Sequence, residues 1–520
     1  MRSFAIAGPV KPLKHYYIPH RLDEKNIKKL IKQQHYFVLH APRQSGKTTG
    51  IEILVRQINE EGEYKALYVN VESAQASRGD FIKSMKTIVD SFARYATQFL
   101  QANDSIFNLV KEISKNITGD SLAILLQDWS KTSEKPIVLV IDEIDSLVGD
   151  TLISILRQIR SGYSGRPEFF PQAICLVGVR DVRDYRIWSD SEQSTILGGS
   201  AFNIKAESFT LENFSREQVA NLYFQHTQET GQKFTQEAID YAYELTQGQP
   251  WLTNMLGYQA CLEDPLMTDE PGTADASKIV TKEVIERAKE TIIRRRDTHI
   301  DVLIARLQEE RVAKIIDAII NGEQESLDVS QDDIQYVLDL GLLIRKDKQL
   351  VIANPIYQEI IPREIGNVLQ DTIVQKIAWY QSADGSLDMQ KLMPAIQQFF
   401  RENGDIWESR NPYKEAAPHI ILMAFLQRVI NGGGRIYREY ALGRKRVDLL
   451  IEFGEQRIVV ELKLFRGKDT LTKGLEQTKK YMEISNATEG HLVIFDRLSK
   501  KLWDERIYHK MVEGLDVWGA

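Results

Sequence analysis

Cysteine is scarce in this 520-residue sequence, and the long apolar segments of exported or membrane-embedded chains are missing. The two cysteines, Cys175 and Cys261, lie far apart, which argues against a disulfide framework and against a zinc site. No segment approaches the roughly 20 apolar residues that span a bilayer, and the sequence before His20 has no uninterrupted apolar stretch that would direct export. We therefore expect a cytoplasmic protein in a reducing compartment, without membrane contact.

Internal repeats and low-complexity segments are missing as well, which leaves an ordinary globular composition of 43% hydrophobic and 27% charged residues. The chain is too long for one hydrophobic core, so we expect about two to four domains. The net charge of −7 argues against coating of nucleic acid by the whole protein, but it leaves room for a local basic groove.

Short apolar runs alternate with longer amphipathic stretches between residues 36 and 179. The runs lack polar alternation, which is typical of strands buried on both faces of a parallel sheet that helices cover. Four strands are predicted, at residues 36–40, 66–71, 137–142 and 173–179. The predicted fold class is therefore α/β, with a parallel-sheet core.

The remaining sequence divides into further predicted domains. A helical pattern follows the sheet, with a capped start at TLENFSREQ and a helix boundary at TQGQPWLTN. Three helix patterns and a short strand pair then give the order of a winged helix, and a turn-rich segment precedes a second, separate α/β unit. The predicted domains are a core at 1–208, a helical lid at 209–298, a winged helix at 299–366, a connector at 367–410 and an α/β unit at 411–520.

The segment YFVLHAPRQSGKTT, residues 36–49, predicts a strand, a turn and the start of a helix, which is the context of a phosphate-binding loop. Backbone N–H groups and the positive helix end would surround phosphates, Lys47 would reach the outer ones, and the Thr48 hydroxyl would ligate Mg²⁺. Ala41 replaces the usual first glycine, which is acceptable if its φ is negative. The residues expected to contact the nucleotide are Ala41, Pro42, Arg43, Gln44, Ser45, Gly46, Lys47, Thr48 and Thr49.

Two acids lie at the end of the predicted strand at residues 137–142: Asp142 is its last residue, and Glu143 follows directly. We expect Asp142 to hold Mg²⁺ through water and Glu143 to polarise the attacking water, so that Mg-ATP is bound and hydrolysed. Asp145 suits the start of a helix as a capping residue.

Arg180 follows the next predicted strand and is a candidate sensor of the γ-phosphate or an arginine finger. The alternative is a surface arginine that pairs with Asp181 or Asp184.

With these motifs, residues 1 to about 365 resemble the AAA-like ATPases of the STAND and archaeal type. The resemblance rests on HYYIPHR, HAPRQSGKTT, IVLVIDEID and TQGQPWL. It implies a nucleotide between sheet domain and lid, with Tyr17 and Arg21 near the base and Pro250 contacting it from the lid. It also implies a switch with slow turnover that commonly self-associates. Otherwise Pro250 simply breaks a helix, and HYYIPHR is a docked N-terminal arm.

A second group of chemically suited residues lies in the C-terminal unit. Asp448 lies in VDLLIEF, while Glu461 and Lys463 lie two apart in IVVELKL and so share one face of a strand. A hairpin would bring Asp448 beside them. Two carboxylates and an ammonium suit a divalent metal on a scissile phosphate, with Asp448 and Glu461 as its ligands. The alternative is a surface pair of Glu461 and Lys463.

This group resembles the PD-(D/E)XK nuclease superfamily, with Val447 in place of the proline. Gln477 and Tyr481 resemble the QxxxY element of RecB-like members. The upstream acid of that superfamily is either Glu415 or Glu439. Residues 434–468 contain nine Arg or Lys and five Asp or Glu, which favours a polyanion such as DNA.

Three functions remain open, and all of them use ATP. The first is an ATP-controlled, Mg²⁺-dependent DNA nuclease in defence or DNA processing. The second is a signalling ATPase whose degenerate nuclease-like domain binds nucleic acid or a partner. The third is a winged-helix regulator, with Arg294, Arg295 and Arg296 as the candidate DNA contacts.

Overall fold

The chain folds into two compact units, which we describe separately. The computed structural model describes residues 2–77, 80–181, 186–189, 194–197, 202–295, 298–321, 329–347, 349–365, 380, 382, 385–410, 422, 426, 434–442, 445–465, 467, 469–496 and 503–519. The first unit comprises Met1–Asp297 and Ile334–Leu343, and the second comprises Thr298–Asp333 and Ile344–Ala520.

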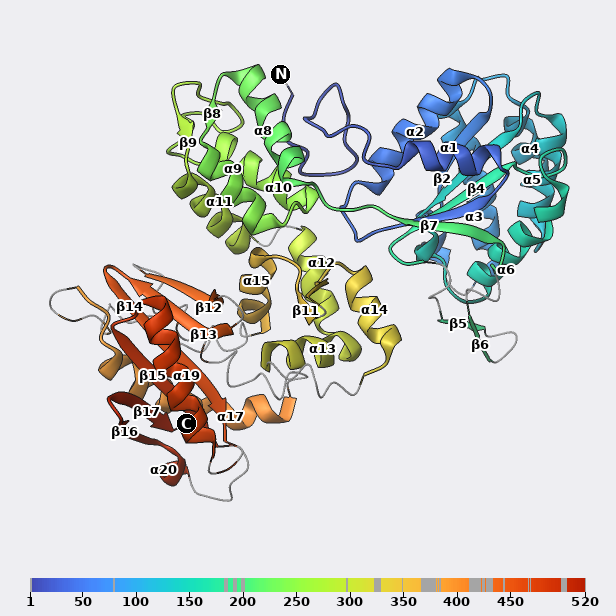
Figure 1. Cartoon of the computed structure of the whole chain (residues 1–520). Helices are drawn as coiled ribbons and strands as arrows, with labels where there is room; N and C mark the ends of the chain where they lie inside the picture. Colours follow the sequence, from blue (N-terminus) through green and yellow to red (C-terminus); the bar gives the residue numbers. More distant parts are fainter. Residues whose placement is uncertain are drawn as a thin grey trace. The chain divides into compact units, whose positions relative to one another are not determined.

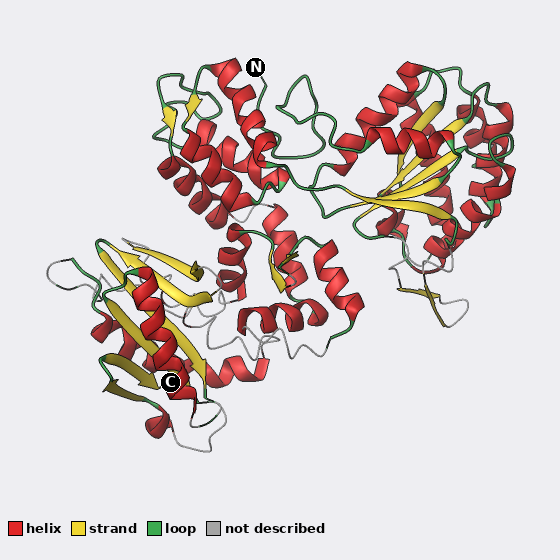
Figure 2. Cartoon of the chain, in the orientation of Figure 1, coloured by secondary structure: helices red, strands yellow, loops and turns green. Residues whose placement is uncertain are grey.

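A five-stranded parallel sheet forms the centre of the first unit (Figures 1 and 2), with the order β2-β3-β4-β1-β7. Its strands are β1 (Tyr36–His40), β2 (Lys65–Asn70), β3 (Ile137–Asp142), β4 (Ala173–Gly178) and β7 (Lys205–Thr210). The first four confirm the predicted runs. β7 was not predicted, because its sequence KAESFT is polar, as befits an edge strand that pairs with β1 alone.

Helices cover both faces of this sheet, and alternate strand residues point to each face. One face packs against α1 (Glu24–Lys32) and α2 (Lys47–Glu61). The other packs against α3 (Phe81–Phe99), α4 (Ser105–Ile113), α5 (Ser121–Thr132) and α6 (Gly149–Ser161). A short hairpin of β5 (Arg186–Ser189) and β6 (Ser194–Leu197) was not predicted.

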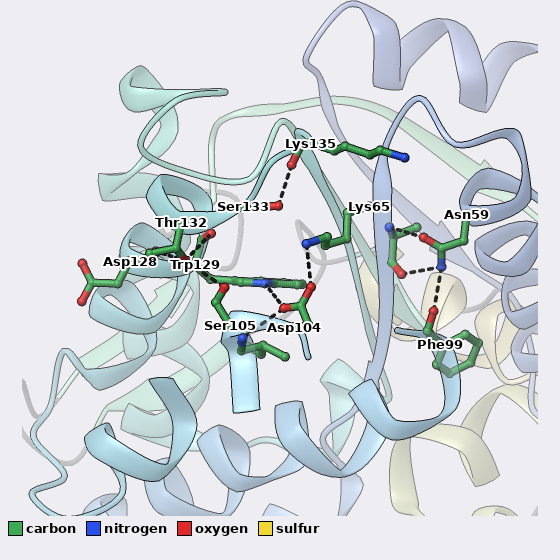
Figure 3. Close-up of polar contacts among 12 residues, drawn as sticks. Asn59, Lys65, Phe99, Asp104, Ser105, Asp128, Trp129, Thr132, Ser133 and Lys135 are labelled. Carbon is green, nitrogen blue, oxygen red and sulfur yellow. Dashed lines mark hydrogen bonds and ion pairs between the residues drawn. The ribbon is translucent and has the colours of Figure 1, made fainter. Parts of the chain in front are cut away.

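A buried carboxylate fixes the helices of the second face to the start of β2 (Figure 3). Asp104 accepts hydrogen bonds from the indole Nε1 of Trp129 at 2.9 Å and from the N–H of Ile106 at 3.0 Å, and it forms an ion pair with Lys65 at 2.6 Å. One side chain therefore caps α4, holds α5 and reaches the sheet.

The lid is a helical bundle that follows the sheet in the same unit. Its elements are α8 (Arg216–Thr230), α9 (Gln236–Thr246), α10 (Pro250–Tyr258), the π-helix η5 (Gln259–Glu263), α11 (Lys282–Arg295) and the two-residue strands β8 (Lys233–Phe234) and β9 (Ile279–Val280). Ser215 and Gln218 form a capping box at the start of α8, which confirms the predicted start. Pro250 occupies the first turn of α10, where proline needs no hydrogen-bond partner.

The N-terminal arm, residues 2–23, contacts both the lid and the core (Figure 1). Trp251 on the lid donates from its indole to the Ile6 carbonyl at 2.9 Å. The Val10 N–H donates to the hydroxyl of Thr49 on α2 at 3.0 Å. The arm is thus ordered by contacts with two parts of one unit.

Residues 298–365 form helices and a two-stranded sheet in the predicted order. The elements are α12 (Thr298–Leu307), α13 (Glu310–Asn321), α14 (Gln331–Asp339), β10 (Leu343–Lys346), β11 (Gln349–Ile352) and α15 (Pro355–Ile365). Residues 334–343 group with the first unit rather than with their sequence neighbours.

A six-stranded mixed sheet dominates the second unit, with the order β12-β13-β14-β15-β17-β16. The strands are β12 (Gly434–Leu442), β13 (Lys445–Phe453), β14 (Gln456–Leu464), β15 (Glu489–Phe495), β16 (Tyr508–Val512) and β17 (Leu515–Gly519), and the helices include α19 (Asp469–Ser485) and α20 (Trp503–Arg506). α19 packs on β14 and β15, where Leu475 meets Leu492 and Ile494.

The helix α17 (Met389–Arg410) lies within the stretch that we expected to be a connector, yet it packs on this sheet. Gln397 donates to the carbonyls of Tyr508 and Gly519, and Phe400 contacts Phe495 with ring centroids 4.9 Å apart. These contacts group α17 with the C-terminal domain. No helix in the described part of the chain is long and apolar enough to cross a bilayer.

Candidate functional site

The loop between β1 and α2 has the backbone of an anion cradle. Positive φ angles occur at Gln44 (58°) and Gly46 (90°), and Ala41 is not among the positive-φ residues, so alanine fits there. The N-terminus of α2 has neither a side-chain cap nor an acid in its first turn. Its first N–H groups, which have no intrahelical acceptor, and the positive end of its dipole favour an anion.

Lys47 places a buried ammonium inside this loop. Its side chain is almost wholly enclosed, and Nζ donates to the carbonyls of Ala41 at 2.7 Å and Pro42 at 3.0 Å. Burial lowers the pKa of Lys47, and the nearby Asp142 and Glu143 act against that shift. A polyphosphate would supply the negative charge that this buried cation favours.

Asp142 joins the end of β3 to the start of α2. Its carboxylate is fully buried, and Oδ2 accepts from the Thr48 hydroxyl at 2.8 Å and from the Tyr68 hydroxyl at 2.7 Å. Oδ1 accepts from the Glu143 N–H at 2.8 Å. This oxygen-donor set of Thr48 and Asp142 matches the hard ligands that Mg²⁺ prefers.

Glu143 sits directly after β3 in a strained backbone conformation, with φ 59° and ψ 39°. Burial, together with the charges of Asp145 and Asp142, raises the pKa of Glu143 to about 7. A carboxyl with a pKa near neutrality is suited to act as a base at physiological pH.

Asp145 does not cap a helix, contrary to our expectation. Its Oδ1 accepts from the N–H of Val179 at 3.1 Å, which ties the turn after β3 to the end of β4. The residue before α6 that takes the capping position is Val148. The DEID sequence continues instead into a 3₁₀ turn at Ile144–Ser146.

Arg180 is buried rather than exposed, so its interpretation as a surface arginine is wrong. Its Nε donates to Asp339 at 3.0 Å, and its guanidinium lies 5.2 Å from the centroid of the Tyr336 ring. Asp181 pairs with Lys205, and Asp184 lies outside the described residues. The partner from α14 could not be predicted from sequence neighbours.

Tyr17, Arg21 and Pro250 line one pocket beside the loop. Gly46 and Thr49 from the loop and α2 line the same pocket. Residues of the arm, the core and the lid therefore converge on a cavity that adjoins the phosphate loop.

Arg21 links three of these segments. Its guanidinium donates to the carbonyls of Ser45 in the loop, at 2.6 Å, and Glu212 before the lid, and lies 4.6 Å from the Phe214 ring centroid. Burial lowers the pKa of Arg21 to about 10. Within the described residues, the Ser45 hydroxyl is buried without a hydrogen-bond partner, so the loop retains polar capacity for a ligand.

The sequence matches the family described as the AAA-like domain over residues 5–362, which is more than half of the chain. This chain belongs to the AAA-like domain family. The phosphate loop, with the acids after β3, is thus the P-loop of an AAA-like ATPase domain. Residues 399–498 match a family described only as a domain of unknown function, and no curated protein matches the chain.

Solved structures with similar folds are distant. The Walker-type ATPase of Pyrococcus abyssi is 15% identical, with a TM-score of 0.45 over 66% of this chain and 96% of that one. The Holliday junction branch migration motor RuvB of Thermotoga maritima is 13% identical, with a TM-score of 0.32 over 65% and 94%. Cdc6p from Pyrobaculum aerophilum is 12% identical, with a TM-score of 0.34 over 69% and 97%. All three scores are below 0.5, so family membership rests on the sequence match.

In the C-terminal domain of this AAA-like protein, β13 pairs with β12 on one side and with β14 on the other. Leu449 pairs with Arg438 on β12 and with Val460 on β14, and Tyr440 pairs with Val447. The described pairing of β13 with β14 runs from Leu449 and Val460 to Phe453 and Gln456, so it ends one residue short of Asp448 and Glu461.

Glu461 is the predicted metal ligand of this domain whose side chain is described. It is 2% exposed and accepts from Lys463 Nζ at 2.6 Å, so the pair of Glu461 and Lys463 forms, but its carboxylate is buried. The side chains of Glu439 and Asp448, and the whole of Glu415, lie outside the described residues. Among the described side chains, no group of three His, Cys, Asp or Glu is arranged to hold a metal ion.

Gln477 and Tyr481 have different surroundings on α19. Tyr481 is buried against Leu450 and Val459, whereas Gln477 is exposed.

The structure adds two residues to the P-loop region that the sequence analysis missed, Tyr68 and Asp339. Tyr68 lies in a predicted strand that ends level with the Asp142 strand, so its position offered a signal. Asp339 offered none, because it lies 159 residues after Arg180.

Proposed function

We propose that the AAA-like domain binds and hydrolyses Mg-ATP and acts as a nucleotide-dependent switch. The observation that carries this proposal is the joined array of Thr48, Asp142 and Glu143 beside the P-loop, in which the pKa of Glu143 is about 7. Thr48 and Asp142 would hold Mg²⁺, which supplies charge neutralisation on the phosphates when bound. Lys47 binds the outer phosphates, and ionised Glu143 accepts a proton from the attacking water.

The pocket beside the loop is proposed to take the nucleoside part of ATP. Tyr17 and Pro250 would border the base, and Arg21 would contact the nucleotide while holding the carbonyl of Ser45. Arg180, two residues after β4, the strand between β1 and β3, is the proposed sensor of the γ-phosphate. The remaining loop residues 41–49 would contribute backbone contacts.

Binding and turnover of ATP test this proposal separately. Lys47→Ala is expected to weaken ATP binding about 100-fold, since a charge-assisted contact contributes roughly 1.5–3 kcal/mol. Glu143→Gln is expected to bind ATP but to lose hydrolysis by about 10²–10⁴-fold. Lys25→Ala, which removes an exposed lysine of α1, is the control. Hydrolysis by Glu143→Gln at the wild-type rate would contradict the assignment.

We also propose a second activity, metal-dependent cleavage of DNA by the C-terminal domain under control of the ATPase. The buried Glu461 carboxylate, which pairs with the Lys463 ammonium two residues further on β14, favours it. In this proposal Asp448 and Glu461 hold the metal, Lys463 orients water, and either Glu415 or Glu439 is the upstream acid. A role in defence or DNA processing would follow.

Cleavage of single- and double-stranded DNA with Mg²⁺ or Mn²⁺, with and without ATP, tests the second activity. Asp448→Ala and Lys463→Ala should abolish cleavage, and Lys479→Ala, which removes an exposed lysine of α19, should not. Lys47→Ala should remove only the effect of ATP. No cleavage under any condition would exclude the nuclease and favour a signalling ATPase with a partner-binding domain.

As the third function, we propose that residues 299–366 act as a winged helix that binds DNA. DNA binding without cleavage would favour it if binding depended on the cluster at Arg294–Arg296. Arg294 and Arg295 are exposed at the end of α11, and Arg296 lies outside the described residues. Self-association into a homo-oligomer in the cytoplasm completes the proposal and is measurable by sedimentation.

A further inference from the structure

The hydroxyl of Tyr68 makes a contact that the sequence motifs do not include. Tyr68 on β2 is 2% exposed and donates to Oδ2 of Asp142 at 2.7 Å. Its register partner on β3 is Val140, two residues before Asp142, so Tyr68 and Asp142 lie on the same face of neighbouring parallel strands. The contact therefore follows from the register of the sheet and not from a mobile loop.

The ring of Tyr68 is held in place from the helix side. Tyr95 on α3 packs edge-on against it with centroids 5.5 Å apart, and Phe99 lies at 5.9 Å. A buried aromatic ring that packs against two others has little rotational freedom, so its hydroxyl has a fixed direction.

Three donors together fix the Asp142 carboxylate. Oδ2 accepts from Tyr68 and from Thr48, and Oδ1 accepts from the Glu143 N–H. Because the Thr48 proton points to Asp142, the lone pairs of the Thr48 oxygen remain available to a cation. Rotation of the carboxylate would break this arrangement.

We propose that Tyr68 is a positioning residue of the magnesium site, which orients Asp142 and, through it, the Thr48 hydroxyl. This inference rests on the proposed binding of Mg-ATP. Tyr68 touches neither nucleotide nor metal. It acts as an outer partner of the residues that do, and such partners typically change metal affinity or activity by about 10–100-fold.

Binding of ADP to the full chain, measured by calorimetry with excess Mg²⁺ and again with EDTA, tests the inference. The Kd in EDTA divided by the Kd in excess Mg²⁺ reports how strongly Mg²⁺ and ADP are coupled. We expect Tyr68→Phe to reduce this ratio about tenfold while leaving the Kd in EDTA within twofold of the wild type. Tyr95→Phe is the matched control, because it also removes a hydroxyl from this aromatic cluster. In the described chain, the Tyr95 hydroxyl makes no hydrogen bond to Asp142.

The outcomes separate this inference from the proposed function. An unchanged ratio in Tyr68→Phe would overturn the positioning role and leave the ATPase proposal intact. Equal weakening in Mg²⁺ and in EDTA would show that the hydroxyl supports only the fold, which also overturns the role. Failure of the wild type to bind ADP under either condition would overturn both proposals. Circular dichroism confirms that each variant is folded.

Discussion

At the scale of single residues, several non-glycine residues of the proposed nucleotide site have a strained backbone. Positive φ angles occur at Gln44 in the loop, at Glu143 after β3, at Gln247 after α9 and at His20 beside the pocket. For residues other than glycine this conformation costs about 1–3 kcal/mol, and it persists only where surrounding contacts impose it. The site residues are therefore held in place by tertiary contacts.

Hydrolysis of ATP should depend on pH through Glu143. Only the ionised carboxylate can accept a proton, and the pKa of Glu143 is about 7. We expect kcat/KM to rise through neutral pH and to level off above pH 8, with roughly a tenfold loss per pH unit on the acid side. Rates measured between pH 5.5 and 9 test this, and a profile that stays flat across neutrality would contradict it.

Asp145→Asn provides a sharper test of the same residue. Asp145 is the nearby charge that contributes most, after burial, to the raised pKa of Glu143. Asparagine removes that charge but retains an oxygen that can accept from Val179. The midpoint of the kcat/KM profile should therefore move to lower pH. A midpoint that stays in place, or moves upward, would show that Asp145 does not set it.

At the scale of elements, buried carboxylates connect segments that are far apart in sequence. Asp104 joins α4, α5 and β2, and Asp339 joins the end of α14 to the end of β4. In both cases the carboxylate is buried and paired, so its removal breaks a contact between distant segments and takes an ion-pair partner from a cation.

Asp104→Ala should lower the free energy of unfolding by about 3 kcal/mol, because it removes the cap of α4 and leaves the Trp129 N–H and the Lys65 ammonium without this acceptor. Figure 3 shows these contacts, together with Asp128 on the neighbouring helix. Asp128 is exposed and lies 3.8 Å from Lys131, so Asp128→Ala should cost less than about 0.5 kcal/mol. Urea denaturation of both variants tests the difference, and similar losses would contradict it.

Asp339→Ala should destabilise the first unit by about 3–5 kcal/mol, because the Arg180 guanidinium would be left buried without its carboxylate. The side chains of both residues are less than 10% exposed. In the double variant Asp339→Ala with Arg180→Ala, the loss of unfolding free energy should be smaller than the sum of the losses in the two single variants. Additive losses would show that the pair is not coupled.

At the scale of the whole molecule, the chain consists of two compact units, and the proposed nucleotide site belongs to one of them. A ligand stabilises only the unit that binds it. Mg-ATP at 100 times its Kd should raise the free energy of unfolding of the first unit by about 2.7 kcal/mol.

Scanning calorimetry with and without Mg-ATP tests this selectivity. One transition should move to higher temperature, and Lys47→Ala should abolish the movement. A shift of every transition by the same amount would show that the two units unfold as one.

Local sequence predicted much of the core and part of the candidate site. Runs without polar alternation identified β1 to β4, and the order of glycine, lysine and threonine identified the P-loop, because these depend on neighbours along the chain. The edge strand β7 was missed, since a polar edge strand resembles a loop. Gln477 and Tyr481 were grouped by helical spacing, which does not indicate which of them is buried.

Sequence motifs alone indicated the residue types of the P-loop and the acids after β3, and they predicted Asp448, Glu461 and Lys463 in the C-terminal strands. Only the tertiary structure decided that Tyr68 and Thr48 share one oxygen of Asp142, that Arg180 is paired with Asp339, and that Asp145 binds the end of β4. The physical reason is that these contacts depend on sheet register and on packing between distant segments. Sequence motifs and periodicity depend on residues that are close along the chain, so they do not indicate such contacts.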